Sequence, residues 1–244
     1  MAGNGPGLDG PARNRPHPPD DSVRSALTGP HARFARRRGD ALSYPPDMSP
    51  FTALPDSPGD ADWADVAALA GPGGGVALTG LAAGPPDGWE VVTRDTVFQL
   101  VGDGIAAAPD AEAVRLTRVD VPDMLALAAR TRPGPFLPRT IEMGVYLGIR
   151  HEGRLVAMAG ERLRPPGWTE ISGVCTDPDR RGRGLGTRLV LAVAAGIRER
   201  GETPFLHVVA SNTAALRLYE SLGFRLHRTM TLLITRPPAE VPAG

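Results

Sequence analysis

The chain has 244 residues and a formal net charge of zero, because 27 acidic residues are balanced by 27 arginines and lysine is absent. This length is enough to bury a substantial core, as one large domain or two small ones. The single cysteine, Cys175, excludes an intramolecular disulfide, and the absence of lysine excludes a nucleotide-binding P-loop. No apolar run is long enough to span a membrane and no apolar signal core opens the chain, so we expect a cytoplasmic protein.

The first 47 residues are rich in proline, glycine and arginine and contain few apolar residues. Such a segment buries too little surface to offset the entropy lost on ordering, so we predict a disordered tail over residues 1–47. The composition changes at Met48, which leads to the hypothesis that Met48 is the true start. Residues 237–244 are predicted to form a second disordered tail.

Residues 48–113 are acidic and are predicted to form an α/β lobe. Asp60–Ala70 has the apolar spacing of a helix, and a glycine-rich stretch ends it. Val76–Leu81 and Trp89–Val101 are predicted to be strands, and the second is rich in the β-branched and aromatic residues typical of strands. From residue 49 onward the lobe has ten acids and one arginine, a net charge of −9, and no motif in it indicates a site.

Residues 114–236 are predicted to form a basic domain, with nineteen arginines and eleven acids, a net charge of +8. Apolar periodicity and turn residues give the order β-α-(α)-β-β-β-α-β-α-β. The expected strands are Val114–Leu116, Tyr146–Arg150, Arg154–Arg162, Glu170–Thr176, Phe205–Ala210 and Phe224–Thr235. The expected helices are Val121–Thr131, Leu185–Arg200 and one that Ser211 or Asn212 caps and that runs to Leu222, with a short helix or turn over Pro138–Met143. A basic domain suits an anionic cofactor, and no nucleic-acid-binding signature appears, so no nucleic acid partner is expected.

Three glycines alternate with other residues in Arg181-Gly-Arg-Gly184-Leu-Gly186, between an apolar strand and an amphipathic helix. Glycine lets backbone N–H groups approach a ligand closely, a helix N-terminus adds partial positive charge, and arginine adds full charge. The pattern therefore predicts a pyrophosphate-binding loop. The dinucleotide fingerprint Gly-x-Gly-x-x-Gly does not fit, because Gly186 follows Gly184 by two residues rather than three.

The loop fits the pattern Arg/Gln-x-x-Gly-x-Gly/Ala, and with the segment from His207 to Phe224 it resembles the GNAT N-acetyltransferase superfamily. The resemblance covers Val114 to Arg236, and its last part looks like the glycine N-acyltransferase-like branch, in which a preceding region forms a second, degenerate α/β lobe. It implies an α/β (α+β) fold with a mixed, mostly antiparallel sheet flanked by helices. It also implies an N-acetyltransferase that uses acetyl-CoA as co-substrate and needs no metal.

The resemblance assigns the cofactor site to the end of one strand, the loop after it and a later helix cap. These residues are Val174, Cys175, Thr176, Arg181, Gly182, Arg183, Gly184, Leu185, Gly186, Thr187 and Asn212. The strand end is expected to pair with the pantetheine arm, a β-bulge is expected at Gly173, and the Val174 N–H is a candidate for polarising the thioester oxygen. Asn212 has a helix cap as its alternative role.

The chemistry requires a neutral amine and a proton for the departing thiolate. Tyr219 matches the tyrosine that protonates the thiolate in many family members, and core packing is its alternative role. Glu170 and Glu161 are the candidate bases, and for either the alternative is a surface pair with arginine. An α-amine with a pKa near ~8 is about a tenth neutral at pH 7, so it needs a base less than a lysine amine does. His207 is expected to be structural, and Cys175 is not expected to act as a nucleophile.

Two other functions are also compatible with the sequence. A non-catalytic CoA-binding regulatory module would bind the cofactor and transfer nothing. An interaction protein would use the basic half to meet an acidic partner or nucleic acid. The acceptor is open among small-molecule and peptide amines, and the sequence gives no oligomeric state.

Overall fold

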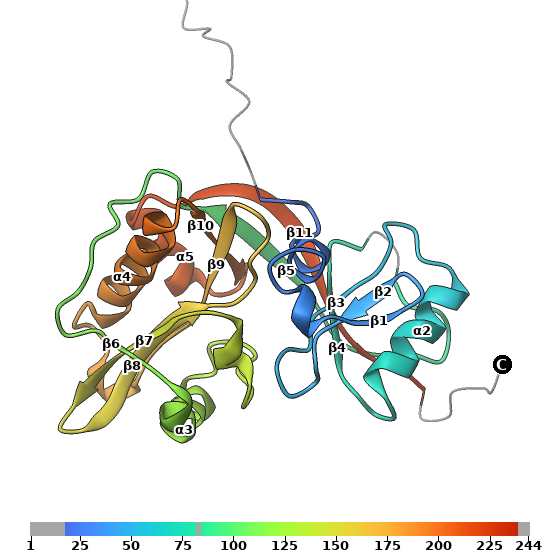
Figure 1. Ribbon diagram of the computed structural model, residues 1–244, viewed down its shortest axis with the longest axis horizontal. Helices are drawn as coiled ribbons and strands as arrows, with labels where there is room; N and C mark the ends of the chain where they lie inside the picture. Colours follow the sequence, from blue (N-terminus) through green and yellow to red (C-terminus); the bar gives the residue numbers. More distant parts are fainter. Residues whose placement is uncertain (1–17, 82–83, 239–244) are drawn as a thin grey trace, which may run out of the picture.

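The computed structural model describes residues 18–81 and 84–238, which form two sheets (Figure 1). The large sheet has the strand order β4-β11-β5-β10-β9-β8-β7-β6, and the small sheet has the order β1-β2-β3. Neighbouring strands of the large sheet are antiparallel except β9 and β10, which are parallel. The predicted mixed, mostly antiparallel sheet is therefore confirmed.

The elements follow the predicted order closely. The helices are α1 (Ser22–Leu27), α2 (Asp60–Ala70), α3 (Val121–Thr131), α4 (Leu185–Glu199) and α5 (Thr213–Ser221). The strands are β1 (Arg36–Arg38), β2 (Ala41–Ser43), β3 (Thr52–Ala53), β4 (Val76–Thr79), β5 (Glu90–Val101), β6 (Val114–Arg115), β7 (Tyr146–His151), β8 (Arg154–Glu161), β9 (Trp168–Thr176), β10 (Thr203–Val209) and β11 (Arg225–Arg236). Short 3-10 turns lie at Ala32–Phe34, Arg118–Asp120, Thr140–Met143 and Pro178–Arg180.

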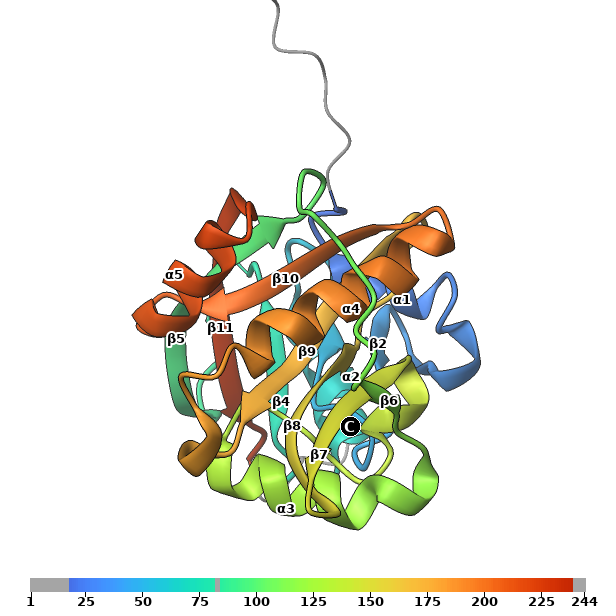
Figure 2. The ribbon, with the colours of Figure 1, turned by 90° about the vertical axis from the view of Figure 1, so that its left-hand side faces the viewer.

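Helices α4 and α3 cover opposite faces of the large sheet, and Figure 2 shows α4 lying across it. Successive residues of a strand point to opposite faces. Met158 of β8 accordingly packs with Met124 of α3, whereas the next residue, Ala159, packs in the cluster that holds Leu189 of α4. The two helices thereby fix the sheet from both sides and hold the ends of β9 and β10 in place.

The N-terminal segment is folded, so the prediction of a disordered tail over 1–47 is wrong for residues 18–47. Val23, Leu27, Leu42 and Tyr44 are each no more than 4% exposed and belong to one core cluster. The few apolar residues of this segment are concentrated where they meet the sheet, which an average over composition hides. A chain starting at Met48 would lack this part of the core. Residues 1–17 and 239–244, where the rest of the two predicted tails falls, lie outside the described residues.

The predicted division between a lobe over 48–113 and a domain over 114–236 does not follow the sheet. Strand β5 belongs to the first segment by sequence, yet it lies between β10 and β11 of the second and pairs with both. Figure 1 shows β5 and β11 running from the half of the molecule with α4 and α5 to the half with β1–β3 and α2. Both segments therefore share one continuous sheet.

Within the described residues, no helix is both long enough and apolar enough to cross a bilayer.

Candidate functional site

The glycine loop joins β9 to α4 and is open to solvent. Gly182 and Gly184 both have φ of 73°, a conformation that other residues adopt only with strain, and no atom lies within 4 Å of where their Cβ atoms would be. The backbone N–H groups from Gly182 to Thr187 donate no hydrogen bond within the described part of the chain. Six free donors therefore surround the N-terminus of α4, where its dipole favours negative charge.

The arginines near this loop fall into two groups. Arg180, Arg181 and Arg183 form no ion pair or side-chain hydrogen bond with any described residue, whereas Arg188 is held by Asp110 at 2.6 Å. The first three side chains are therefore free to neutralise an anion at the loop, as expected for Arg181 and Arg183.

Strands β9 and β10 separate just before the loop. They pair only from Trp168 with Thr203 to Glu170 with Phe205, so the rest of β9 has no partner strand on that edge. A bulge in β9 opposite β8 lies in the same place, and Gly173 within it has φ of 64°. A Cβ at Gly173 would lie 3.1 Å from the Tyr146 ring. The bulge predicted at Gly173 is thus present, and it leaves an extended edge free for an added strand.

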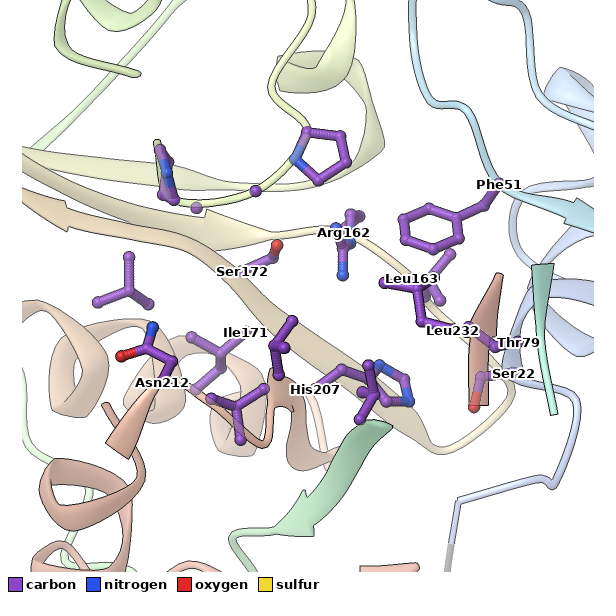
Figure 3. Close-up of a pocket in the computed structure, with 18 of the residues that line it drawn as sticks. Ser22, Phe51, Thr79, Arg162, Leu163, Ile171, Ser172, His207, Asn212 and Leu232 are labelled. Carbon is purple, nitrogen blue, oxygen red and sulfur yellow. The ribbon is translucent and has the colours of Figure 1, made fainter. Parts of the chain in front are cut away.

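A cavity of about 290 Å³ opens where the two strands separate. Figure 3 shows Asn212 at one end and Phe51, Thr79 and Ser22 at the other, with Arg162 and His207 between them. Its wall includes Ile171, Ser172, Gly173 and Val174 of β9, His207, Val208 and Val209 of β10, and Ala215 and Tyr219 of α5. The cavity therefore runs from the helix that follows β10 to the N-terminal part of the molecule.

Tyr219 lines the cavity and is 8% exposed. Burial, with a smaller contribution from Cys175, raises the pKa of its hydroxyl to about 12. No described residue forms a hydrogen bond with this hydroxyl. Tyr219 is therefore a protonated donor at neutral pH with its proton free for a ligand, although its ring also packs in the core beside Phe224.

Asn212 performs its capping role and also reaches the cavity. Its side chain accepts a hydrogen bond of 3.1 Å from the Ala215 N–H at the start of α5, and the residue lies in the cavity wall. The cap fixes the position of α5, and hence of Tyr219, relative to β10.

Glu170 lies behind the cavity wall rather than in it. It is fully buried and accepts hydrogen bonds from Arg162 at 2.7 and 2.8 Å, from the Leu163 N–H at 3.2 Å and from His207 at 2.7 Å. Burial alone would raise the pKa of this carboxyl, but the charge and hydrogen bonds of Arg162 and His207 outweigh it and hold the pKa well below its usual range. A carboxylate engaged in this way is a weak base, so its geometry is that of a positioning group.

The structure does not bring Glu161 to the cavity. Its carboxylate accepts from Arg200 at 2.8 Å and from the Val145 N–H at 3.2 Å, which corresponds to the arginine pairing considered as its alternative. Cys175 is poorly suited to act as a nucleophile, because burial raises the pKa of its thiol to about 11.

Several cavity residues were not predicted from the sequence: Ser22, Val23, Phe51, Arg162 and His207. The first three come from segments distant in sequence, and no local pattern indicates them. His207 carried a usable signal, because it is a polar residue in an apolar strand, where burial requires a partner. Arg162 follows the end of β8, and no local pattern indicates it. Among the described residues, no group of three or more His, Cys, Asp or Glu side chains is arranged to hold a metal ion.

The known proteins that this chain is similar to include acetyltransferases. Residues 146–233 match the family described as FR47-like protein. The chain is 38% identical over 96 residues to the mycothiol acetyltransferase of Thermomonospora curvata, covering 39% of this chain and 32% of that protein. It is 41% identical over 83 residues to the N-alpha-acetyltransferase RimI of Mycobacterium tuberculosis, covering 33% and 51%. The chain thus spans about a third and about half of the lengths of these two curated relatives.

A solved structure extends the likeness to nearly the whole chain. It is a GNAT-family protein from Novosphingobium aromaticivorans with 41% sequence identity and a TM-score of 0.83. The match covers 91% of this chain and 99% of that one.

Proposed function

Because the chain belongs to the GNAT acetyltransferase family, we propose that it transfers an acetyl group from acetyl-CoA to a primary amine. The observation that carries the proposal is the combination of a free-donor loop at the start of α4 with the unpaired edge of β9 directly before it. The loop supplies donors for a diphosphate, and the edge supplies backbone groups for an extended arm. A linear diphosphate carrier with an amide-containing arm, such as CoA, fits both.

The N–H groups from Gly182 to Thr187 would hold the diphosphate, with Arg181 and Arg183 beside it. The edge from Val174 to Thr176 would pair with the pantetheine arm, and the Val174 N–H would be the candidate for polarising the thioester oxygen. Asn212 contacts the carrier where it reaches the cavity.

The reaction proceeds by direct attack of the neutral amine on the thioester carbonyl. A C–N bond forms and the C–S bond breaks, the thiolate takes the Tyr219 proton, and the proton released by the amine passes to solvent, from which Tyr219 is reprotonated. Glu170 holds Arg162 and His207 in position and does not act as the base. An α-amine with a pKa near ~8 is about a tenth neutral at pH 7. It therefore suits a cavity in which Glu170 does not act as the base.

The finer family placement is also a proposal. The likeness of the last strand–helix–strand segment to the glycine N-acyltransferase-like branch is supported by the N-terminal part of the chain, because Ser22, Val23 and Phe51 close one end of the cavity as an added lobe would. The relatives named above include one acetyltransferase of mycothiol and one N-alpha-acetyltransferase, so small-molecule and peptide amines are both represented among them.

Calorimetric titration with CoA tests the proposal, with Gly184→Leu as the diagnostic variant. A side chain at Gly184 would stand among the free N–H groups, so we expect the Kd for CoA to rise at least tenfold. Gly201→Leu is the matched control: Gly201 has φ of 75° and no atom within 4 Å of an added Cβ, but it follows the other end of α4. Equal effects of the two variants, or no CoA binding by the unmodified protein at millimolar concentration, contradict the proposal.

A further inference from the structure

A buried guanidinium with one unused nitrogen lies in the cavity wall. The Arg162 side chain is 9% exposed, and its Nε and Nη2 donate to Glu170 at 2.8 and 2.7 Å. Its Nη1 has no acceptor among the described residues, although Arg162 lines the cavity (Figure 3). A donor without a partner on a guanidinium that lines a cavity is a place where the acceptor oxygen of a ligand can bind.

Apolar side chains lie beside Arg162 in this half of the cavity, together with the polar residues Ser22 and Thr79. The guanidinium lies over the Phe51 ring at 4.6 Å, and the neighbouring wall is formed by Val23, Leu163 and Leu232. Figure 3 shows Phe51, Leu163 and Leu232 together at the end away from Asn212. This end therefore suits a hydrocarbon group placed beside an anion.

Negative charge is scarce in the described lining of the cavity. Asp20 is the one acidic residue there; its side chain is 75% exposed and pairs with Arg228 at 2.7 Å. A polyamine or another polycation would bring several charges into a cavity that offers no buried carboxylate for them. The electrostatic arrangement disfavours such acceptors.

We propose that the amine acceptor carries a carboxylate and an apolar side chain, as an apolar amino acid does, and that Arg162 Nη1 binds the carboxylate. This inference rests on the proposed acetyl transfer and specifies its substrate class. Phe51, Val23 and Leu232 receive the side chain, and the amine is directed toward the separated strands where the thioester lies.

The carboxylate contact also helps the amine to react. A neighbouring carboxylate raises the pKa of an amine by favouring its ammonium form. Pairing of that carboxylate with Arg162 offsets its charge and returns the amine toward its neutral, nucleophilic form. Arg162 would thus increase both affinity and the reactive fraction.

Release of free thiol from acetyl-CoA, measured with L-leucine, L-leucinamide and putrescine, provides the first test. Loss of one hydrogen bond to a charged group weakens binding by about tenfold to a hundredfold. The kcat/KM for L-leucine should therefore exceed that for L-leucinamide by at least tenfold. Preference for L-leucinamide or putrescine would overturn the inference.

A paired variant identifies the residue responsible. Arg162→Gln/Glu170→Gln removes both charges together, so no buried ion is left alone. The leucine-to-leucinamide ratio should fall to about one in this variant while the Kd for CoA is unchanged. Arg164→Gln/Glu202→Gln is the matched control, because it removes another arginine–glutamate pair, at 2.8 Å, outside the cavity, and its ratio should match that of the unmodified protein. Equal losses for both amines in the first variant would mean that Arg162 acts on the thioester, which overturns the inference.

Binding of the acetylated products separates this inference from the proposed activity and does not depend on whether the variant folds. Calorimetry on the unmodified protein with CoA present should show N-acetyl-L-leucine binding at least tenfold more tightly than N-acetyl-L-leucinamide. If that preference is found but no amine is acetylated, the subsite stands and the proposed transfer fails. If neither product binds, or both bind equally, the inference is overturned.

Discussion

The Tyr219 side chain is buried enough for its hydroxyl to stay protonated, and it also lines the cavity. The pKa of about 12 means that the hydroxyl is neutral across the physiological range, so it holds a proton that a thiolate formed beside it can accept. Arg162 shows a similar division, because two of its nitrogens hold Glu170 and the third has no acceptor among the described residues, although the side chain lines the cavity. At both residues a single side chain has a structural part and a part left free for a ligand.

For Tyr219, we expect Tyr219→Phe to lower kcat by roughly a hundredfold, because proton donation by a positioned group contributes about that much. The Kd for CoA should change little, since the ring and its packing remain. Steady-state kinetics combined with calorimetry measures both quantities. An unchanged kcat would remove Tyr219 from the mechanism.

Among the elements, α1 and the 3-10 turn that follows it dock the N-terminus through a buried histidine. His31 lies between the Tyr44 hydroxyl at 2.9 Å and the Met143 carbonyl at 3.0 Å. A carbonyl can only accept, so Nε2 carries the proton and Nδ1 accepts from Tyr44. Burial lowers the pKa of His31 from 6.5 to about 4 despite the carbonyl contact, so this docking depends on a neutral ring.

Acid should therefore weaken the docking of α1. The pKa is lower in the folded state, so between pH 6.5 and 4 the unfolded state binds the proton first and stability falls as pH falls. We expect the free energy of unfolding to drop by about 2 kcal/mol between pH 7 and 5 from this residue. Urea denaturation at each pH measures the free energy of unfolding. Its fall between pH 7 and 5 should be smaller by this amount in His31→Gln and unchanged in His151→Gln, whose imidazole is exposed. The same pH dependence in both variants would contradict it.

In the molecule as a whole, part of the charge imbalance of the sequence is used for internal contacts. Arginines of the basic segment pair with acids of the preceding segment: Arg188 with Asp110 and Glu112, Arg225 with Asp103, and Arg236 with Glu90. The charge difference that suggested an anionic ligand thus joins the two segments. The arginines left unpaired around the glycine loop are a better guide to the ligand than the total charge.

The shared sheet makes a further prediction about independent folding. Residues 114–236 expressed alone lack β4 and β5, so β10 loses one partner strand, β11 loses both of its partners, and three strand edges are left unpaired. We expect no cooperative thermal unfolding by circular dichroism for this fragment. A fragment of residues 18–238 should unfold cooperatively near the Tm of the full chain. Cooperative unfolding of 114–236 with a native-like spectrum would contradict the shared sheet.

Local patterns in the sequence were enough to predict most helices and strands from Asp60 onward, and to find the glycine loop. Helix periodicity, glycine stops and β-branched runs act within about 15 residues, so α2, α3, α4 and the β7–β8 hairpin could be predicted to within a few residues. The loop was readable because its glycines and arginines are adjacent in the chain.

What required the tertiary structure was every feature made by distant segments. The placement of β5 between β10 and β11, the docking of residues 18–47, and the meeting of Arg162, Glu170 and His207 all depend on which strands become neighbours. The physical reason is that pairing and burial are properties of contacts between segments, whereas a sequence pattern reports the preferences of one segment. The glycine loop is therefore largely encoded locally, whereas the cavity beside Arg162 is created by the fold.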